Sequence, residues 1–442
     1  MAPALLVMLP QGRAARALRA AVRLILPIAL SLVLTACVGE PAPGPTPEPA
    51  PTNSVPATGT RLPSPTATPA PEAGLAGDIV LWHSWNSEDL KLLNSMLDRL
   101  QSDHPGLYLD AVHVSPSEVG ERLLDAILAG NGPNLLLAPI TRYTDLASEN
   151  LVQPLNGYMD LVQEANLLSS AWYGNTIASN LVALPAWVET VALNVNTDLI
   201  APDEVPRTLD DLLARADLSD SPLLGLYISP FHLGWGFPAY GAVMLDAGYR
   251  VVLDEQPGAE AWLTWLREAN QSRGIWLSQD YAELQRAFRH GELPMIIDGS
   301  WTLASFVSAL GDSLRVLSIP DGPAGPARPY VTSESFFVIA GQSPRDTDAS
   351  VMAALALIEL AANSPHTTRG LPAAQRESEA DARAAREFKA LLEQTVPMHV
   401  GPGAKVIWDL AQFMFERALA GQEPPADLVA RFALLANEQT GR

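Results

Sequence analysis

The chain has 442 residues, of which 48% are hydrophobic and only 17% are charged, and its formal net charge is -21. Phosphate-rich partners are bound by clustered Lys and Arg, so this balance argues against nucleic acid or an anionic lipid surface as the ligand. About 365 residues follow residue 77, which exceeds the usual size of one hydrophobic core. We therefore expect two domains or lobes in the folded part.

The first 36 residues have the organisation of an export signal. Four arginines precede a short apolar run at 24–34, and small residues follow it. A bilayer span needs about 20 apolar residues, so this run predicts a cleaved signal peptide at 1–36 and not a permanent membrane helix. Its removal takes the four positive charges away and changes the net charge from -21 to -25, because residues 1–36 contain no Asp or Glu.

Cys37 is the only cysteine in the chain, and it closes the segment Leu34-Thr35-Ala36-Cys37. The segment resembles the lipobox of bacterial lipoproteins, in which the cysteine becomes the acylated N-terminus and carries chains such as palmitate. This resemblance implies a lipid anchor on the extracytoplasmic side of the cell membrane. The alternative is a cysteine of no special role at the end of an apolar segment.

Residues 37–77 are expected to form a stalk. Eleven of the 38 prolines lie between 38 and 77. Closely spaced prolines favour the extended polyproline II conformation, so these 40 residues could reach about 120 Å at roughly 3.1 Å per residue. Proline-rich segments also serve as SH3-type ligands, but a tether suits an exported chain better.

The chain then alternates strand and helix patterns. The first five predicted elements are a strand at 78–82, a helix at 87–100, a strand at 107–114, a helix at 119–129 and a strand at 135–138. Later patterns predict helices at 261–269 and 281–290 and strands at 295–298 and 336–340. This order is typical of an α/β fold with a mostly parallel sheet, in which ligands bind at the carboxyl ends of the strands.

Several short motifs occur in a fixed order along the chain. They are DIVLWHSW at 78–85, GPN at 132–134, LP at 184–185, LNVN at 193–196, MIIDGSW at 295–301 and GLP at 370–372. Together they resemble extracellular solute-binding protein family 1, the maltose-binding-like receptors of bacterial ABC importers. The resemblance covers residues 77–435.

The resemblance implies a type II periplasmic-binding-protein fold, with two lobes that each contain a mostly parallel sheet flanked by helices. The N-terminal lobe would comprise 78–188 plus 321–370, and the C-terminal lobe 189–320 plus 371–442. Hinge crossings are expected near 185–194, 319–330 and 370–372. A monomer of this kind would capture a carbohydrate between its lobes and deliver it to the permease subunits of an ABC transporter.

Tryptophans are the first candidates for the binding site, because the C–H face of a sugar ring packs on an aromatic ring. Trp85 and Trp301 follow predicted strands, and Trp235 lies between glycines that indicate a loop. Trp408 matches a position that lines the cleft in the family. Trp187 is left open between packing and binding, whereas packing is expected for Trp82, Trp172, Trp262, Trp265 and Trp276.

Three polar residues are further candidates. Glu189 and Arg142 match family positions that bind sugar hydroxyls, although an ordinary ion pair is the alternative for both. Glu334 is expected just before the strand at 336–340, where it lines the cleft or begins a turn. Ala138 and Thr141 stand where maltose-type members have an aromatic residue and a carboxylate, which favours a sugar other than maltodextrin.

Other classes of function have weaker support. The sequence has no nucleophile elbow, P-loop, HExxH motif or dinucleotide fingerprint, so we expect neither an enzyme nor a cofactor. Chance pairs of carboxylates are unavoidable among 49 acidic residues, and the seven histidines lack metal-ligand spacing. The alternatives that remain are a receptor for polyamines or glycerol phosphates, a carbohydrate-active hydrolase, or a surface sensor without a transporter.

Overall fold

The computed structural model describes residues 75–442, with gaps at 144, 364–369, 374–382 and 402. The predicted signal peptide, Cys37 and nearly all of the stalk lie outside the described residues. Among the helices of the described part, none has the length and apolar character needed to cross a bilayer.

One large sheet organises the described residues. Its strands are β1 (Gly77–His83), β2 (Leu107–His113), β3 (Leu135–Pro139), β6 (Leu184–Asn196), β7 (Leu224–Tyr227), β8 (Ile275–Ser278), β9 (Met295–Gly299), β10 (Leu314–Leu317), β11 (Tyr330–Val338), β12 (Leu371–Pro372) and β13 (Val396–Pro397). β4 (Thr176–Ile177) and β5 (Asn180–Leu181) form a separate hairpin. The main strand order is β2-β1-β3-β11-β6-β9-β7-β8.

Helices cover this sheet and fill the connections between its strands. The α-helices are α2 (Ser87–Asp103), α3 (Val119–Leu128), α4 (Asp145–Ser148), α5 (Met159–Glu164), α6 (Ser169–Gly174), α7 (Leu209–Asp217), α8 (Pro230–Leu233), α9 (Gly236–Ala239), α10 (Pro257–Gln271), α11 (Tyr281–Arg289), α12 (Leu303–Leu310), α13 (Pro344–Ala362), α14 (Arg383–Leu391), α15 (Ala404–Ala420) and α16 (Pro425–Thr440). The 3-10 helices are η2 (Ile140–Arg142), η3 (Asn156–Tyr158), η4 (Leu253–Glu255), η5 (Ser300–Thr302), η6 (Gly311–Ser313) and η7 (Leu392–Gln394).

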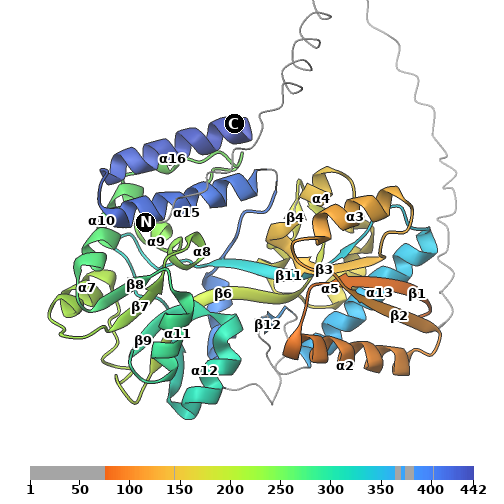
Figure 1. Cartoon of the computed structure of the whole chain (residues 1–442), viewed down its shortest axis with the longest axis horizontal. Coiled ribbons are helices and arrows are strands. Elements are labelled where there is room, and N and C mark those ends of the chain that lie inside the picture. Colours follow the sequence, from red (N-terminus) through yellow and green to blue (C-terminus); the bar gives the residue numbers. More distant parts are fainter. Residues whose placement is uncertain (1–74, 144, 364–369, 374–382, 402) are drawn as a thin grey trace, which may run out of the picture. The chain divides into compact units, whose positions relative to one another are not determined.

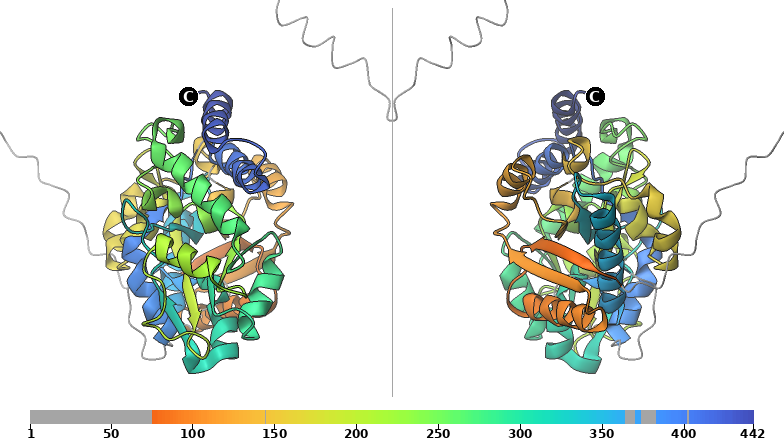
Figure 2. Two further views of the ribbon diagram at one scale, coloured as in Figure 1. Left: turned by 90° about the vertical axis from the view of Figure 1, so that its left-hand side faces the viewer. Right: turned by 90° about the vertical axis from the view of Figure 1, so that its right-hand side faces the viewer.

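The sheet has two parts, which we call the N-terminal and C-terminal half-sheets. β2, β1 and β3 run parallel in the first, and β8, β7 and β9 run parallel in the second. β11 and β6 run antiparallel to each other, β11 also to β3 and β6 also to β9, and both lie between the two parts (Figure 1). α2 and α13 contact each other and the N-terminal half-sheet (Figure 2).

β6 is the strand that both half-sheets share. Its first residues, up to Thr190, pair with β11, and its residues from Val191 onward pair with β9. β12 also pairs with the first part of β6, where Leu371 lies opposite Val188. A single strand of 13 residues therefore carries hydrogen bonds to both parts of the sheet.

Burial on both faces explains the apolar strands. In β3, Leu135 and Leu137 join one hydrophobic cluster, whereas Leu136 and Ala138 join another on the opposite face. Successive side chains of a strand point to opposite faces, so a continuous apolar run is required when both faces are covered. The prediction of a doubly buried strand at 135–138 is confirmed.

The first five predicted elements are all present with shifted ends, but one later strand differs. β11 begins at Tyr330, six residues before the predicted start at 336, and it includes Glu334. The Ser and Thr residues before Phe336 made this segment look like a loop. Antiparallel pairing with both β3 and β6 supplies its backbone partners and makes it a strand.

His83, at the end of β1, is a buried histidine. It is only 1% exposed, and its ring lies against that of His113, with the centroids 5.6 Å apart. Burial and the neighbouring His113 lower the pKa of His83 from 6.5 to about 4. Between these two pH values the unfolded chain takes up a proton that the folded chain does not bind.

We therefore expect the free energy of unfolding to fall by up to about 3 kcal/mol as the pH decreases from 6.5 to 4. His83→Asn should reduce this dependence, because the amide still accepts the backbone N–H of Trp85 but does not titrate. Denaturant unfolding across this pH range measures the slope. The exposed His290→Asn is the control, and an unchanged slope in His83→Asn would contradict the assignment.

Candidate functional site

The carboxyl ends of the parallel strands converge on the middle of β6. β3 ends at Pro139, which lies opposite Glu334 of β11, and β9 ends at Gly299, which lies opposite Val191 of β6. We call this region the junction: the segments after β1, β3, β7 and β9, the middle of β6 and the first half of β11. Strand ends of this kind are where open α/β sheets bind ligands.

On the N-terminal side of the junction, Trp85 and Glu334 meet inside the core. Trp85 is 0% exposed and its Nε1 donates a 2.8 Å hydrogen bond to Glu334 Oε1. Its ring lies 4.7 Å from that of Trp187, which is also fully buried. Trp85, which was expected to face a cleft, is therefore buried in this structure, and its backbone N–H donates to His83 Nδ1.

Arg142 is the exposed member of this group. It is the last residue of η2, directly after β3, and its side chain forms a hydrogen bond with the hydroxyl of Tyr143. Burial raises the pKa of Tyr143, Arg142 opposes that rise, and Glu334 adds to it. α15 contacts η2 and also α8, so Arg142 lies where elements of both half-sheets approach each other.

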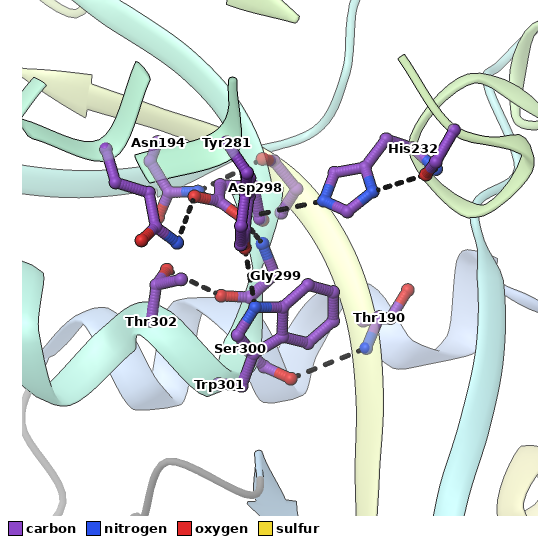
Figure 3. Close-up of polar contacts among 12 residues, drawn as sticks. Thr190, Asn194, His232, Tyr281, Asp298, Gly299, Ser300, Trp301 and Thr302 are labelled. Carbon is purple, nitrogen blue, oxygen red and sulfur yellow. Dashed lines mark hydrogen bonds and ion pairs between the residues drawn. The ribbon is translucent and has the colours of Figure 1, made fainter. Parts of the chain in front are cut away.

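On the C-terminal side, Trp301 belongs to a polar network around a buried carboxylate (Figure 3). Trp301 Nε1 donates to the hydroxyl of Tyr281 at 2.6 Å, and that hydroxyl donates to Asp298 Oδ1 at 2.6 Å. The backbone N–H of Gly299 and the amide of Gln285 also donate to Asp298, at 2.7 and 3.2 Å. Asp298 is 0% exposed, so these donors compensate its loss of water.

Aromatic side chains surround Trp301. The ring centroids of Phe231 and His232 lie 5.8 and 5.6 Å from that of Trp301. Tyr227, at the end of β7, lies 4.7 Å from Tyr281. Trp301 itself is partly exposed. The end of the C-terminal half-sheet is thus an aromatic surface built from three separate segments.

His232 extends the network to Trp235. His232 Nε2 lies 3.6 Å from Asp298 Oδ1, and Ser229 Oγ contacts His232 Nδ1 at 2.8 Å. Trp235 Nε1 donates to the backbone carbonyl of His232 at 2.6 Å. Trp235 is 0% exposed, and its ring packs 4.9 Å from that of Trp262.

The prediction of a loop around Trp235 is therefore wrong. The segment forms two short helices, α8 and α9, and Trp235 is buried between them. A side chain at Gly236 would place its Cβ 2.1 Å from the ring of Trp262. This glycine allows close packing and does not mark an exposed turn.

The two remaining candidates are Glu189 and Trp408. Glu189 is partly buried in β6, opposite Thr332 of β11. Trp408, on α15, donates from Nε1 to the carbonyl of His399 at 3.2 Å, and its ring lies 5.1 Å from that of Tyr330. The rings of Trp408, His399 and Tyr330 help to line a cavity of about 180 Å³.

A second cavity does not coincide with the predicted residues. It has a volume of about 300 Å³, lies between α5 and α13 and is lined by aliphatic side chains and two glutamates. It holds none of the candidates and contacts none of the strand ends, so we do not assign it to the site. In the part of the chain that the structure describes, no three His, Cys, Asp or Glu side chains are grouped to hold a metal ion.

The structure thus brings five of the seven candidates into two groups. Trp85, Glu334 and Arg142 lie near one another, and Trp301 and Trp235 join through His232. Sequence reasoning missed the residues that organise Trp301, namely Tyr281, Gln285, His232 and Asp298. The available signal was Asp298 itself, a lone carboxylate at the end of an apolar strand.

Comparison with known proteins agrees with this architecture. The family model of the bacterial extracellular solute-binding protein matches residues 95–372, more than half of the chain. The maltotriose-binding protein of Pyrococcus abyssi is 26% identical over 289 residues, 61% of this chain and 60% of that protein. The galactooligosaccharide-binding protein of Bacillus subtilis is 24% identical over 206 residues, 43% of this chain and 48% of that protein. The chain thus spans about half to three fifths of the length of these curated relatives.

A solved structure extends the comparison of the fold. The GacH receptor of Streptomyces glaucescens, determined unliganded and with acarbose, superimposes with a TM-score of 0.71 at 18% identity. The match covers 83% of this chain and 99% of that one. The predicted type II periplasmic-binding-protein fold is confirmed, and the chain belongs to the bacterial extracellular solute-binding protein family.

Proposed function

We propose that the protein captures a carbohydrate at the junction and delivers it to the permease of an ABC transporter. The observation that carries this proposal is the partly exposed indole of Trp301, held at the end of β9 among further aromatic rings. An aromatic surface with fixed polar groups suits a sugar ring, which has an apolar face and a polar edge. The sugar-binding relatives and the family membership support the same ligand class.

The proposed lobes are those expected from the sequence: 78–188 plus 321–370, and 189–320 plus 371–442. The exchange of pairing partners within β6, between Thr190 and Val191, supports a boundary close to 189. Contacts of α15 and α16 with α10 support the assignment of the chain end to the C-terminal lobe. Ligand capture would then close the lobes about these crossing strands.

The candidate residues take two kinds of role in this proposal. Trp301, Arg142, Glu189 and Trp408 are exposed or partly buried, and we assign them to contact with the solute. Trp85, Trp235 and Glu334 are buried and lie behind the binding surface, where they hold its shape. Ala138 and Thr141 still favour an oligosaccharide or glycoside other than linear maltodextrin.

The alternatives have less support from the site. A polyamine receptor needs carboxylates that face its ligand, but Asp298 and Glu334 are buried and accept hydrogen bonds from the protein itself. The same burial removes them as a glycosidase pair. A glycerol-phosphate receptor needs more than one cationic side chain, and Arg142 is the only basic candidate.

The first test is a binding panel on the full-length protein with maltotriose, galactooligosaccharide, acarbose, spermidine and glycerol 3-phosphate. We expect a sugar to raise the thermal midpoint and to change the tryptophan fluorescence, because a ligand that binds only the folded state stabilises it. The sugar should be recovered unchanged. Stabilisation by spermidine or glycerol 3-phosphate alone, or release of a hydrolysis product, would refute the proposal.

Trp301→Ala should weaken binding of the sugar found in the panel by about tenfold or more, since it removes the stacking surface. Isothermal titration calorimetry measures the loss, and the thermal midpoint without sugar reports on the fold. Trp276→Ala removes a partly buried tryptophan of β8 that packs on a hydrophobic cluster, and serves as the control. Equal effects of the two variants would show that Trp301 contributes only to packing.

We also propose that Cys37 carries the lipid anchor and that the protein faces the extracytoplasmic side of the membrane, as the family description supports. Cys37→Ser should move the protein from the membrane fraction to the soluble fraction, because the thiol that accepts the diglyceride is lost. Cell fractionation with immunoblotting measures this shift. Retention of the variant in the membrane would argue against lipidation at Cys37.

A further inference from the structure

We propose that Tyr281 is a positioning residue for solute binding, which fixes the indole of Trp301 in one orientation together with Gly299. This inference deepens the proposed function and rests on it for the role of Trp301. It assigns Tyr281 a role that acts through the indole of Trp301. Three independent features of the structure support it.

The first feature is the hydrogen-bond relay from the indole to the carboxylate. Trp301 Nε1 donates to the Tyr281 hydroxyl, and the hydroxyl donates to Asp298 Oδ1, both at 2.6 Å. Burial, followed by the charge of Asp298, raises the pKa of Tyr281. The phenol therefore keeps its proton at all physiological pH values, and the direction of the relay is fixed.

The second feature is the rigidity of the end of the relay. Asp298 is 0% exposed and also accepts from the backbone N–H of Gly299 and the amide of Gln285. It lies in β9, which is paired on both sides, with β6 and with β7. Tyr281 is the first residue of α11, on a different segment (Figure 3). The indole is thus tied through Tyr281 to a carboxylate that cannot move independently of the sheet.

The third feature is the close approach of the indole to Gly299. A Cβ at Gly299 would lie 2.2 Å from the ring atoms of Trp301. The φ of Gly299 is -87°, a value that other residues adopt readily, so the need for glycine comes from the ring and not from the backbone. One side of the indole therefore lies on the main chain.

These restraints determine what Trp301 can offer to a solute. Its only polar atom already donates to Tyr281, so the indole presents its apolar face and no hydrogen-bond donor. A side chain ordered before binding does not lose that freedom on binding, which benefits affinity. Tyr281 contributes through this order and not through contact.

The test compares the full-length protein with Tyr281→Phe, which removes one hydroxyl. Indole 15N–1H spectra, with the Trp301 signal assigned from Trp301→Phe, should show that signal shifted and its N–H exchanging faster. Binding of galactooligosaccharide and acarbose, by calorimetry, should weaken by about three- to tenfold, the loss expected when one ordered side chain becomes free. Tyr158→Phe removes an equivalent 2.6 Å bond to Asp348 on the protein surface and should change neither readout.

A double-mutant cycle separates positioning from general support of the fold. In a Trp301→Ala background, Tyr281→Phe should have no further effect on affinity, because its influence passes through the indole. Gly299→Ala displaces the ring without touching Tyr281 and should lower the affinity in the same way. This second variant keeps the inference testable if Tyr281→Phe folds poorly.

The outcomes distinguish this inference from the proposed function. An unchanged indole signal in Tyr281→Phe, or an additive effect in the Trp301→Ala background, would overturn the role of Tyr281 while sugar binding stands. A shifted indole signal in a protein that binds neither sugar of the test would overturn solute positioning together with the carbohydrate proposal. A shifted Trp301 signal in Tyr281→Phe, together with a loss of affinity, is the supporting result.

Discussion

The shared strand β6 is the constraint on which the rest of the structure depends. Its backbone groups must find partners over 13 residues, first in β11 and β12 and then in β9 and β10. An unpaired buried N–H or C=O is costly, so the partners on both sides are needed for the strand to be buried as it is. Both half-sheets are consequently built on one continuous element, and their parallel strands end toward its centre.

On each side of the centre of β6, a buried carboxylate accepts hydrogen bonds. Glu334 in the N-terminal half-sheet and Asp298 in the C-terminal half-sheet are buried carboxylates near the junction. Glu334 accepts directly from Trp85, and Asp298 accepts from Tyr281, which in turn accepts from Trp301. Burial of a carboxylate requires such donors, and the rings of the donors Trp85 and Tyr281 are fixed in return. These two carboxylates therefore organise aromatic rings, and both already accept hydrogen bonds from the protein.

Local patterns predicted some parts of this molecule well. The helical spacing of apolar residues predicted α2 and α3, and the continuous apolar run at 135–138 predicted a strand with both faces covered. These elements depend on which residues follow one another, and neighbours in sequence determine such patterns. The start of β11 was missed because its Ser, Thr and Glu residues lack any apolar run. Its pairing with β3 and β6 comes from strands distant in the sequence, and no local signal carries that information.

The amino-acid sequence by itself determined the order of strands and helices, the acidic and cysteine-poor character of the folded part, and the motifs that indicate the family. Only the tertiary structure decided which of the tryptophans that follow strands are buried. Trp85 and Trp301 both follow a strand, yet Trp85 is enclosed beside Trp187 and Glu334, whereas Trp301 remains partly exposed on Gly299 and Tyr281. The physical reason is that the exposure of a side chain depends on the residues that pack against it. Many of those residues come from segments far away along the chain.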